Sequence, residues 1–134
     1  MKRYLIGLFL AISSYLAYAQ TTSERLGNAA AMYFGSAVFL KVVSESSCQL
    51  ALTTPSTDYD LTRVRSNISQ RLSRYLEKAE YQQLSGVLYD AEQSIRNDFT
   101  PSLRAATPSQ CHQFATALSE KFFKHKSAWL ALTR

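Results

Sequence analysis

Two cysteines and two histidines are the residues of this chain best suited to nucleophilic or metal chemistry. Cys111 and His112 are adjacent, which would place a thiol next to a candidate base. Neighbouring residues on a helix diverge by about 100° and do not face each other, so this pair does not favour a thiol nucleophile. His112 and His125 are thirteen residues apart, which is not the spacing of a local metal site. The sequence therefore predicts no catalytic residue, no metal site and no cofactor.

Paired carboxylates can perform general acid–base catalysis, and close pairs occur at three places in the chain. Glu77 and Glu80 have i,i+3 spacing, which makes them neighbours on a helix surface. The basic residues Arg74 and Lys78 lie beside them, so a solvated helix face explains this pair without catalysis. No P-loop, nucleophile-elbow or zincin motif is present, and we expect a protein that is not an enzyme. The three pairs are Asp58/Asp60, Glu77/Glu80 and Asp90/Glu92.

A row of basic residues is the feature that most favours binding. These residues recur along one predicted helical segment and would present a basic strip to an acidic partner, to phosphate or to an anionic membrane face. Tyrosines accompany them, and Tyr and Arg are enriched at protein interfaces. We expect a partner-binding surface here, the alternative being an ordinary solvated helix face. Its candidate residues are Arg63, Arg71, Arg74, Lys78, Tyr75 and Tyr81.

Residues 1–19 have the pattern of a cleavable secretory signal peptide. Lys2 and Arg3 give a positive start, an apolar run covers residues 4–19, and the run ends in Ala-Tyr-Ala. Sixteen residues fall short of the roughly 20 that cross a bilayer as a helix, which favours cleavage over a membrane anchor. The first cysteine is Cys48, so a lipid anchor at the cleavage site is not expected. The sequence predicts export to the periplasm of a Gram-negative bacterium, or secretion from another cell.

Cleavage would leave one domain, residues 20–134. Its 115 residues suffice for a single hydrophobic core. Loss of Lys2 and Arg3 leaves 13 of the 15 basic residues against 10 acidic ones, a formal charge of +3. This modest charge does not favour a nucleic-acid partner. Four glycines and three prolines are few, which disfavours a turn-rich β fold.

Cys48 and Cys111 are predicted to form a disulfide. An exported chain enters an oxidising compartment, where an even number of cysteines usually pairs. Closing a loop of about 60 residues would stabilise the fold by roughly 4 kcal/mol on the chain-entropy model. The alternative is two unpaired buried thiols.

The first predicted helix begins at Thr21, which has capping-box spacing to Glu24, and runs to about Ser46. From Ala29 to Val43 the segment is apolar almost all round, as in a buried central helix. A membrane-inserting segment is the alternative, but this apolar stretch is too short to span a bilayer.

The second predicted helix starts after Asp58 or Asp60 as N-cap and places Arg63, Asn67 and Arg71 opposite its apolar stripe. The third covers roughly residues 81–98, separated from the second by a bend near residues 79–82, because one continuous helix would be too long for so small a domain. The second stripe comprises Leu61, Val64, Ile68, Leu72, Tyr75, Leu76 and Ala79, and the third Leu84, Val87, Leu88, Ala91, Ile95 and Phe99.

The last predicted helix begins with Thr107 as N-cap, Pro108 at the first helical position and Gln110 at the third. Pro101 is predicted to end the preceding helix, because the residue before a proline is pushed out of the α region. The fold class is therefore all-α: a small antiparallel bundle of about four helices, with one disulfide and a preceding cleavable signal peptide. The last helix's buried stripe comprises Cys111, Phe114, Ala115, Leu118, Phe122 and Trp129.

Size, export, a disulfide-pinned bundle and the lack of a catalytic set favour a non-enzymatic protein-binding module. An inhibitor, or an immunity protein for an envelope-acting toxin, has this general build. We expect the partner to be another periplasmic protein, with no nucleic acid and no membrane insertion of the mature form. The alternatives are a periplasmic chaperone or stress protein, and a carrier of a small apolar ligand. The aromatic residues that would surround such a ligand are Phe34, Phe39, Phe114, Phe122 and Trp129.

Overall fold

The computed structural model describes residues 22–134. The predicted signal peptide, residues 1–19, and Thr21 as the N-cap of the first helix lie outside this range. The elements are α2 (Thr22–Ser44), the short 3-10 helix η1 (Gln49–Ala51), α3 (Leu61–Leu72), α4 (Lys78–Arg104) and α5 (Pro108–Leu132). The prediction of an all-α bundle of about four helices is confirmed, and residues 22–134 contain no strand.

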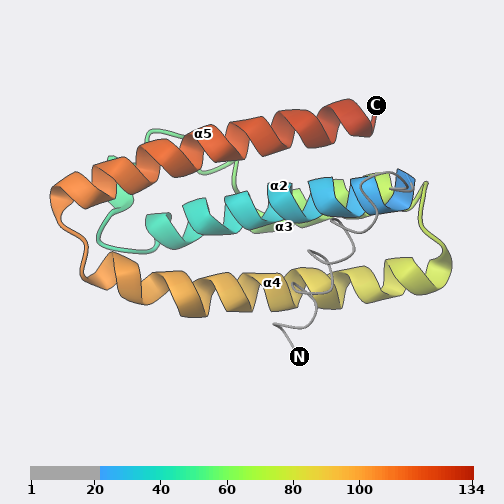
Figure 1. Ribbon diagram of the computed structural model, residues 1–134, viewed down its shortest axis with the longest axis horizontal. Helices are drawn as coiled ribbons and strands as arrows, with labels where there is room; N and C mark the ends of the chain where they lie inside the picture. Colours follow the sequence, from blue (N-terminus) through green and yellow to red (C-terminus); the bar gives the residue numbers. More distant parts are fainter. Residues whose placement is uncertain (1–21) are drawn as a thin grey trace.

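The helices lie along a common direction, with α2 in the middle (Figure 1). Helix α5 lies on one side of α2, α4 on the other and α3 behind it, and α2 contacts all three. Helices α2 and α4 run in one direction and α3 and α5 in the other, so consecutive helices are antiparallel. The architecture is therefore three helices packed around one.

Helix α2 occupies the centre because apolar or small side chains cover almost all of its circumference. Phe34, Ala37, Val38, Leu40 and Val43 are fully buried. The outer helices bury single stripes, which leaves their other faces to water. Those stripes are Leu61, Val64, Ile68 and Leu72 on α3, Leu88, Glu92 and Leu103 on α4, and Cys111, Ala115, Phe122 and Trp129 on α5.

The length of α2 corrects one sequence-based argument. By length and composition alone, Glu24–Ser44 is sufficient to cross a membrane. The prediction that this segment is too short to span a bilayer was therefore wrong. Its burial provides the better criterion, because 56% of its most apolar window is buried inside the bundle. The central helix of a bundle is apolar on nearly all sides, so it can have the length and composition of a membrane-spanning helix.

Local side chains define the helix starts that the sequence predicted best. The Asp60 carboxylate accepts hydrogen bonds from the backbone N–H groups of Thr62 and Arg63, at 2.9 and 3.3 Å, which confirms it as an N-cap. At the start of α5, Thr107 and Gln110 form the predicted capping box. The Thr107 N–H donates to Gln110 Oε1 at 2.8 Å, and the Gln110 N–H donates to Thr107 Oγ1 at 3.2 Å.

The break between the second and third helices was predicted about five residues too late. Helix α3 ends at Leu72 and α4 begins at Lys78, so the two are separate helices joined by residues 73–77. The Glu77 N–H donates to Glu80 Oε1 at 3.2 Å, which satisfies a donor at the start of α4. This pair of carboxylates, interpreted from sequence as part of a solvated face, therefore marks a helix start.

Two further predictions about these helices were wrong. Tyr75 and Ala79 lie beyond the end of α3 and are exposed, and Val87 is 43% exposed, so the predicted apolar stripes end or shift there. Helix α4 also continues through Pro101 to Arg104. Leu103 in its last turn is 1% exposed, and burial of this side chain favours the helical turn despite the missing proline N–H.

The predicted disulfide is present between Cys48 and Cys111, whose Cα atoms are 5.1 Å apart. Cys48 directly precedes η1, and Cys111 lies in the first turn of α5. The bridge thus fixes the segment after α2 against the start of the last helix. A second link across this region is the hydrogen bond that the Thr54 hydroxyl donates to Ser119 Oγ at 3.0 Å.

We predict that a Cys48→Ala/Cys111→Ala variant stays helical and loses about 2–4 kcal/mol of unfolding free energy, because its unfolded chain is no longer closed into a loop. Urea denaturation followed by circular dichroism measures this loss. Wild type in a strong reductant is the matched control and should shift by a similar amount. An unchanged midpoint in both samples would show that the bridge does not contribute to stability.

Candidate functional site

The connection between α3 and α4 brings together most of the side chains predicted to contact a partner. We call residues 73–81 the corner. Arg74 and Lys78 are exposed, and Tyr75 and Tyr81 keep 40% and 39% of their surface exposed. The Tyr75 N–H and the Leu76 N–H both donate to the Leu72 carbonyl at 2.9 Å. These bonds order the turn that presents the two tyrosines.

The corner carries charges of both signs. Glu77 and Glu80 are exposed and lie between or beside the two basic residues. The corner is therefore not the continuous basic strip that the sequence predicted. Its chemistry is that of a mixed surface, with two partly exposed tyrosine rings among charges of both signs.

Arg71 does not belong to the corner, because its guanidinium is used inside the bundle. It donates to the backbone carbonyl and to the hydroxyl Oγ1 of Thr133, at 3.2 and 2.7 Å. One turn earlier, the Trp129 indole N–H donates to Asn67 Oδ1 at 2.8 Å. These two contacts between α3 and the end of α5 define what we call the seam. The side of α3 that was predicted to be solvated thus packs against α5 at Asn67 and Arg71.

Arg71 also lies near Tyr33, a buried tyrosine of α2. Burial raises the pKa of the Tyr33 phenol above its ordinary value, the Arg71 charge opposes this rise and Asp58 adds to it. The phenol therefore stays protonated at neutral pH, and the guanidinium supplies a fixed positive charge beside it.

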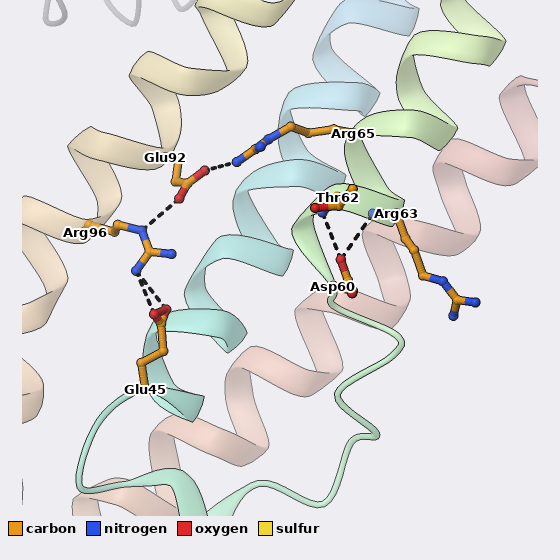
Figure 2. Close-up of polar contacts among 7 residues, drawn as sticks. All are labelled: Glu45, Asp60, Thr62, Arg63, Arg65, Glu92 and Arg96. Carbon is orange, nitrogen blue, oxygen red and sulfur yellow. Dashed lines mark hydrogen bonds and ion pairs between the residues drawn. The ribbon is translucent and has the colours of Figure 1, made fainter.

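Arg63 is exposed one turn before Asn67, and its side chain points away from the neighbouring Glu92 contacts (Figure 2). It lies near the start of α3, whereas the corner follows the end of that helix. The six predicted residues are therefore divided: Arg74, Tyr75, Lys78 and Tyr81 lie together at the corner, and Arg63 and Arg71 lie along α3.

A chain of alternating charges, which was not predicted from the sequence, joins α3, α4 and the residue that follows α2. Glu92 of α4 accepts hydrogen bonds from Arg65 of α3 and, at 2.9 Å, from Arg96 Nε (Figure 2). Arg96 Nη1 donates in turn to Glu45, which follows α2, at 2.8 and 3.2 Å. Only the i,i+4 spacing of Glu92 and Arg96 is visible in the sequence. In the sequence Glu92 stands two residues after Asp90 as a carboxylate pair, whereas its partners in the structure are arginines.

Glu92 is the charged side chain at the centre of this network, and its residue is 7% exposed. Burial lowers the pKa of Arg96, but the hydrogen bonds and charges of Glu45 and Glu92 outweigh that effect and raise it above its ordinary value. The buried carboxylate is paired on two sides, with Arg65 and with Arg96. A buried charge is tolerated under this condition.

The cysteine and histidines that could do chemistry are separated in space or already bonded. Cys111 is bonded to Cys48 and is not available as a thiolate nucleophile. Within residues 22–134, no group of three or more His, Cys, Asp or Glu side chains is placed to hold a metal ion. Burial and the nearby Lys124 and Lys121 charges lower the pKa of His125 below its ordinary value, so this imidazole is neutral at pH 7.

The aromatic residues considered as a ligand site pack within the core. Phe34, Phe122 and Trp129 are fully buried. Phe99 stacks edge-on with Phe39 and with Phe114, at centroid distances of 5.1 and 5.6 Å. Two surface hollows, of about 460 and 290 Å³, are lined by other residues.

No protein-family model, no curated protein and no solved structure shows significant similarity to this chain.

We predict that Glu92→Ala lowers the free energy of unfolding by about 1–3 kcal/mol, because two arginines lose their shared partner. Both arginines are partly exposed, so the loss should stay below that of a fully buried pair. Asp90→Ala, two residues away, is the control and should change stability by less than about 0.5 kcal/mol. Equal losses in the two variants, measured by urea denaturation, would contradict a structural role of the network.

We predict that His125 titrates below pH 6.5, the ordinary value for histidine. The folded state then binds this proton more weakly than the unfolded state, so stability falls as the pH falls below about 6.5. NMR titration of the imidazole measures the midpoint, and Lys124→Gln should raise it. His125→Gln should remove this part of the pH dependence of stability. A midpoint at or above 6.5 would show that desolvation and the lysines do not control this group.

Proposed function

We propose that this chain is an exported, non-enzymatic protein-binding module that acts by occupying its partner. The apolar N-terminal segment and the disulfide suggest export, since such bridges form and persist in oxidising compartments. We propose the bacterial periplasm as that compartment. An inhibitor, or an immunity protein for an envelope-acting toxin, would act in this way.

The observation that carries the proposal is the corner. Tyr75 and Tyr81 expose about two-fifths of their surface within seven residues, with Arg74 and Lys78 next to them. Tyrosine provides a large contact area and a hydroxyl while ordering few rotatable bonds, and arginine provides several donors. The exposed part of each ring is free to contact a partner.

The frame behind the corner also supports binding. Two contacts support the corner directly: the seam contact of Arg71, which lies two residues before it, and the Glu77–Glu80 hydrogen bond within it. A preorganised surface loses less conformational entropy on binding than a flexible one. Charges of both signs at the corner favour a partner with a matching arrangement of charges, which would give specificity.

We predict that a photo-crosslinking amino acid at position 75 or 81 forms a covalent adduct of one reproducible mass in cells of the native host. The same amino acid at position 89 is the control, because Tyr89 lies on the same helix and is 59% exposed but is about 12 Å further along α4 from Tyr81. Mass spectrometry identifies the adduct. Equal labelling at all three positions, or no adduct at any, would contradict the proposal.

With that partner purified, Tyr81→Ala should weaken binding by about 2 kcal/mol, as for an interface hot spot, and Tyr89→Ala should leave binding nearly unchanged. Isothermal titration calorimetry measures both.

A further inference from the structure

Charged side chains are divided unevenly between parts of this chain. Helix α3 and residues 121–134 together hold seven basic side chains and no acidic one, whereas the rest of residues 20–134 holds six basic and ten acidic ones. A net charge of +3 conceals this separation. The seven basic residues are Arg63, Arg65, Arg71, Lys121, Lys124, Lys126 and Arg134.

The fold places these two basic segments side by side. Although they are about 60 residues apart in sequence, α3 and the end of α5 run in the same direction and meet at the seam. Arg63 lies four residues before Asn67, and Lys126 lies three residues before Trp129. Residues at these spacings share a helix face, so Arg63 and Lys126 flank one end of the seam. Arg134 directly follows Thr133 and lies at its other end.

Not every positive charge near the seam is available to a ligand. Arg65 is paired with Glu92, and Arg71 is bound to Thr133. Arg63 and Arg134 are exposed, and the half-buried Lys126 has its ammonium 5.9 Å from the Phe122 ring centre. We call these three residues the cationic face.

Asp58 and Asp60 lie close to the cationic face and offset part of its charge, because Asp58 acts electrostatically on the nearby Tyr33 and Asp60 precedes α3. Asp60 directly precedes α3, and its carboxylate already accepts the backbone N–H groups of Thr62 and Arg63. Glu120 is the last acidic residue before the end of the chain. Positive charges grouped in this way raise the local potential and attract an anionic partner.

We propose that the cationic face binds an acidic segment of a partner protein. Carboxylates fit the guanidinium groups of Arg63 and Arg134, which donate two parallel hydrogen bonds to such groups. A bilayer surface fits less well, because stable insertion needs exposed apolar side chains among the cations, and Trp129 at the centre of the seam is fully buried. The inference rests on the proposed protein-binding function but uses a surface other than the corner.

The test measures binding of a fluorescein-labelled oligoglutamate peptide by fluorescence anisotropy at low and at high ionic strength. The protein is the chain recovered after export from an expression host. The variant Arg63→Gln/Lys126→Gln/Arg134→Gln removes the cationic face and leaves the seam intact. The control Arg25→Gln/Lys41→Gln/Arg104→Gln removes the same charge elsewhere. Circular dichroism and urea denaturation verify that both variants fold.

We expect wild type to bind the peptide more weakly as salt rises. The first variant should bind about five-fold more weakly, the combined effect of three exposed ion pairs of ordinary strength, and the control less than about two-fold. Equal weakening in the two variants, or no binding by wild type, would overturn the proposal. A different outcome is that the first variant loses binding to phosphatidylglycerol vesicles but keeps binding to oligoglutamate. That outcome would overturn the proposal in favour of a membrane surface. None of these results alters the crosslinking test at the corner, so the two proposals fail separately.

Discussion

The burial of α2 is the constraint on which the rest of the structure depends. A helix that is apolar on nearly all sides cannot face water on more than a narrow strip without a large cost in free energy. Within residues 22–134, three further helices are available to cover it. Each of them contributes one apolar stripe and keeps its remaining surface polar. The arrangement of three helices around one is the compact solution to this problem, and it leaves the functional surfaces on the outer helices and their connections.

Polar contacts then decide how the outer helices are positioned around α2. Apolar stripes alone allow helices to slide or rotate at modest cost, whereas a buried hydrogen bond has one geometry. The seam fixes α3 against α5 through Asn67–Trp129 and Arg71–Thr133. The Arg65–Glu92–Arg96–Glu45 chain fixes α4 against α3 and the end of α2. The disulfide holds the opposite end of α5, near its start. These three devices lie on different sides of the bundle, so together they define a single packing.

The same contacts divide the basic residues into structural and available groups. Arg65, Arg71 and Arg96 are used within the fold, while Arg63, Arg74 and Lys78 remain exposed. The proposed function relies only on the available group, at the corner and along the cationic face. Both surfaces lie on helices that contacts within the bundle hold in place. The corner offers aromatic contact area, and the cationic face offers charge.

The sequence by itself determined the helical class, the central helix, the disulfide and the starts of α3 and α5. Each of these depends on signals in the sequence: side-chain periodicity, capping residues such as Asp60 and Thr107, or an even cysteine count after an N-terminal segment that has the pattern of a signal peptide. Predictions from the sequence were wrong where tertiary packing outweighed a local preference or where no local residue marked a helix end. Pro101 does not end α4 because Leu103 is buried beyond it, and the break after Leu72 carries neither Gly nor Pro to mark it.

Only the tertiary structure decided which polar residues face each other. Asn67 and Arg71 were predicted on a solvated side because α5 lies 62 residues away in sequence. The sequence also does not reveal the pairing of Glu92 with Arg65 or the contact between the two basic segments, because these residues are far apart along the chain. Periodicity shows that a helix has two faces, and the pattern of long-range contacts then determines which polar residues another helix covers.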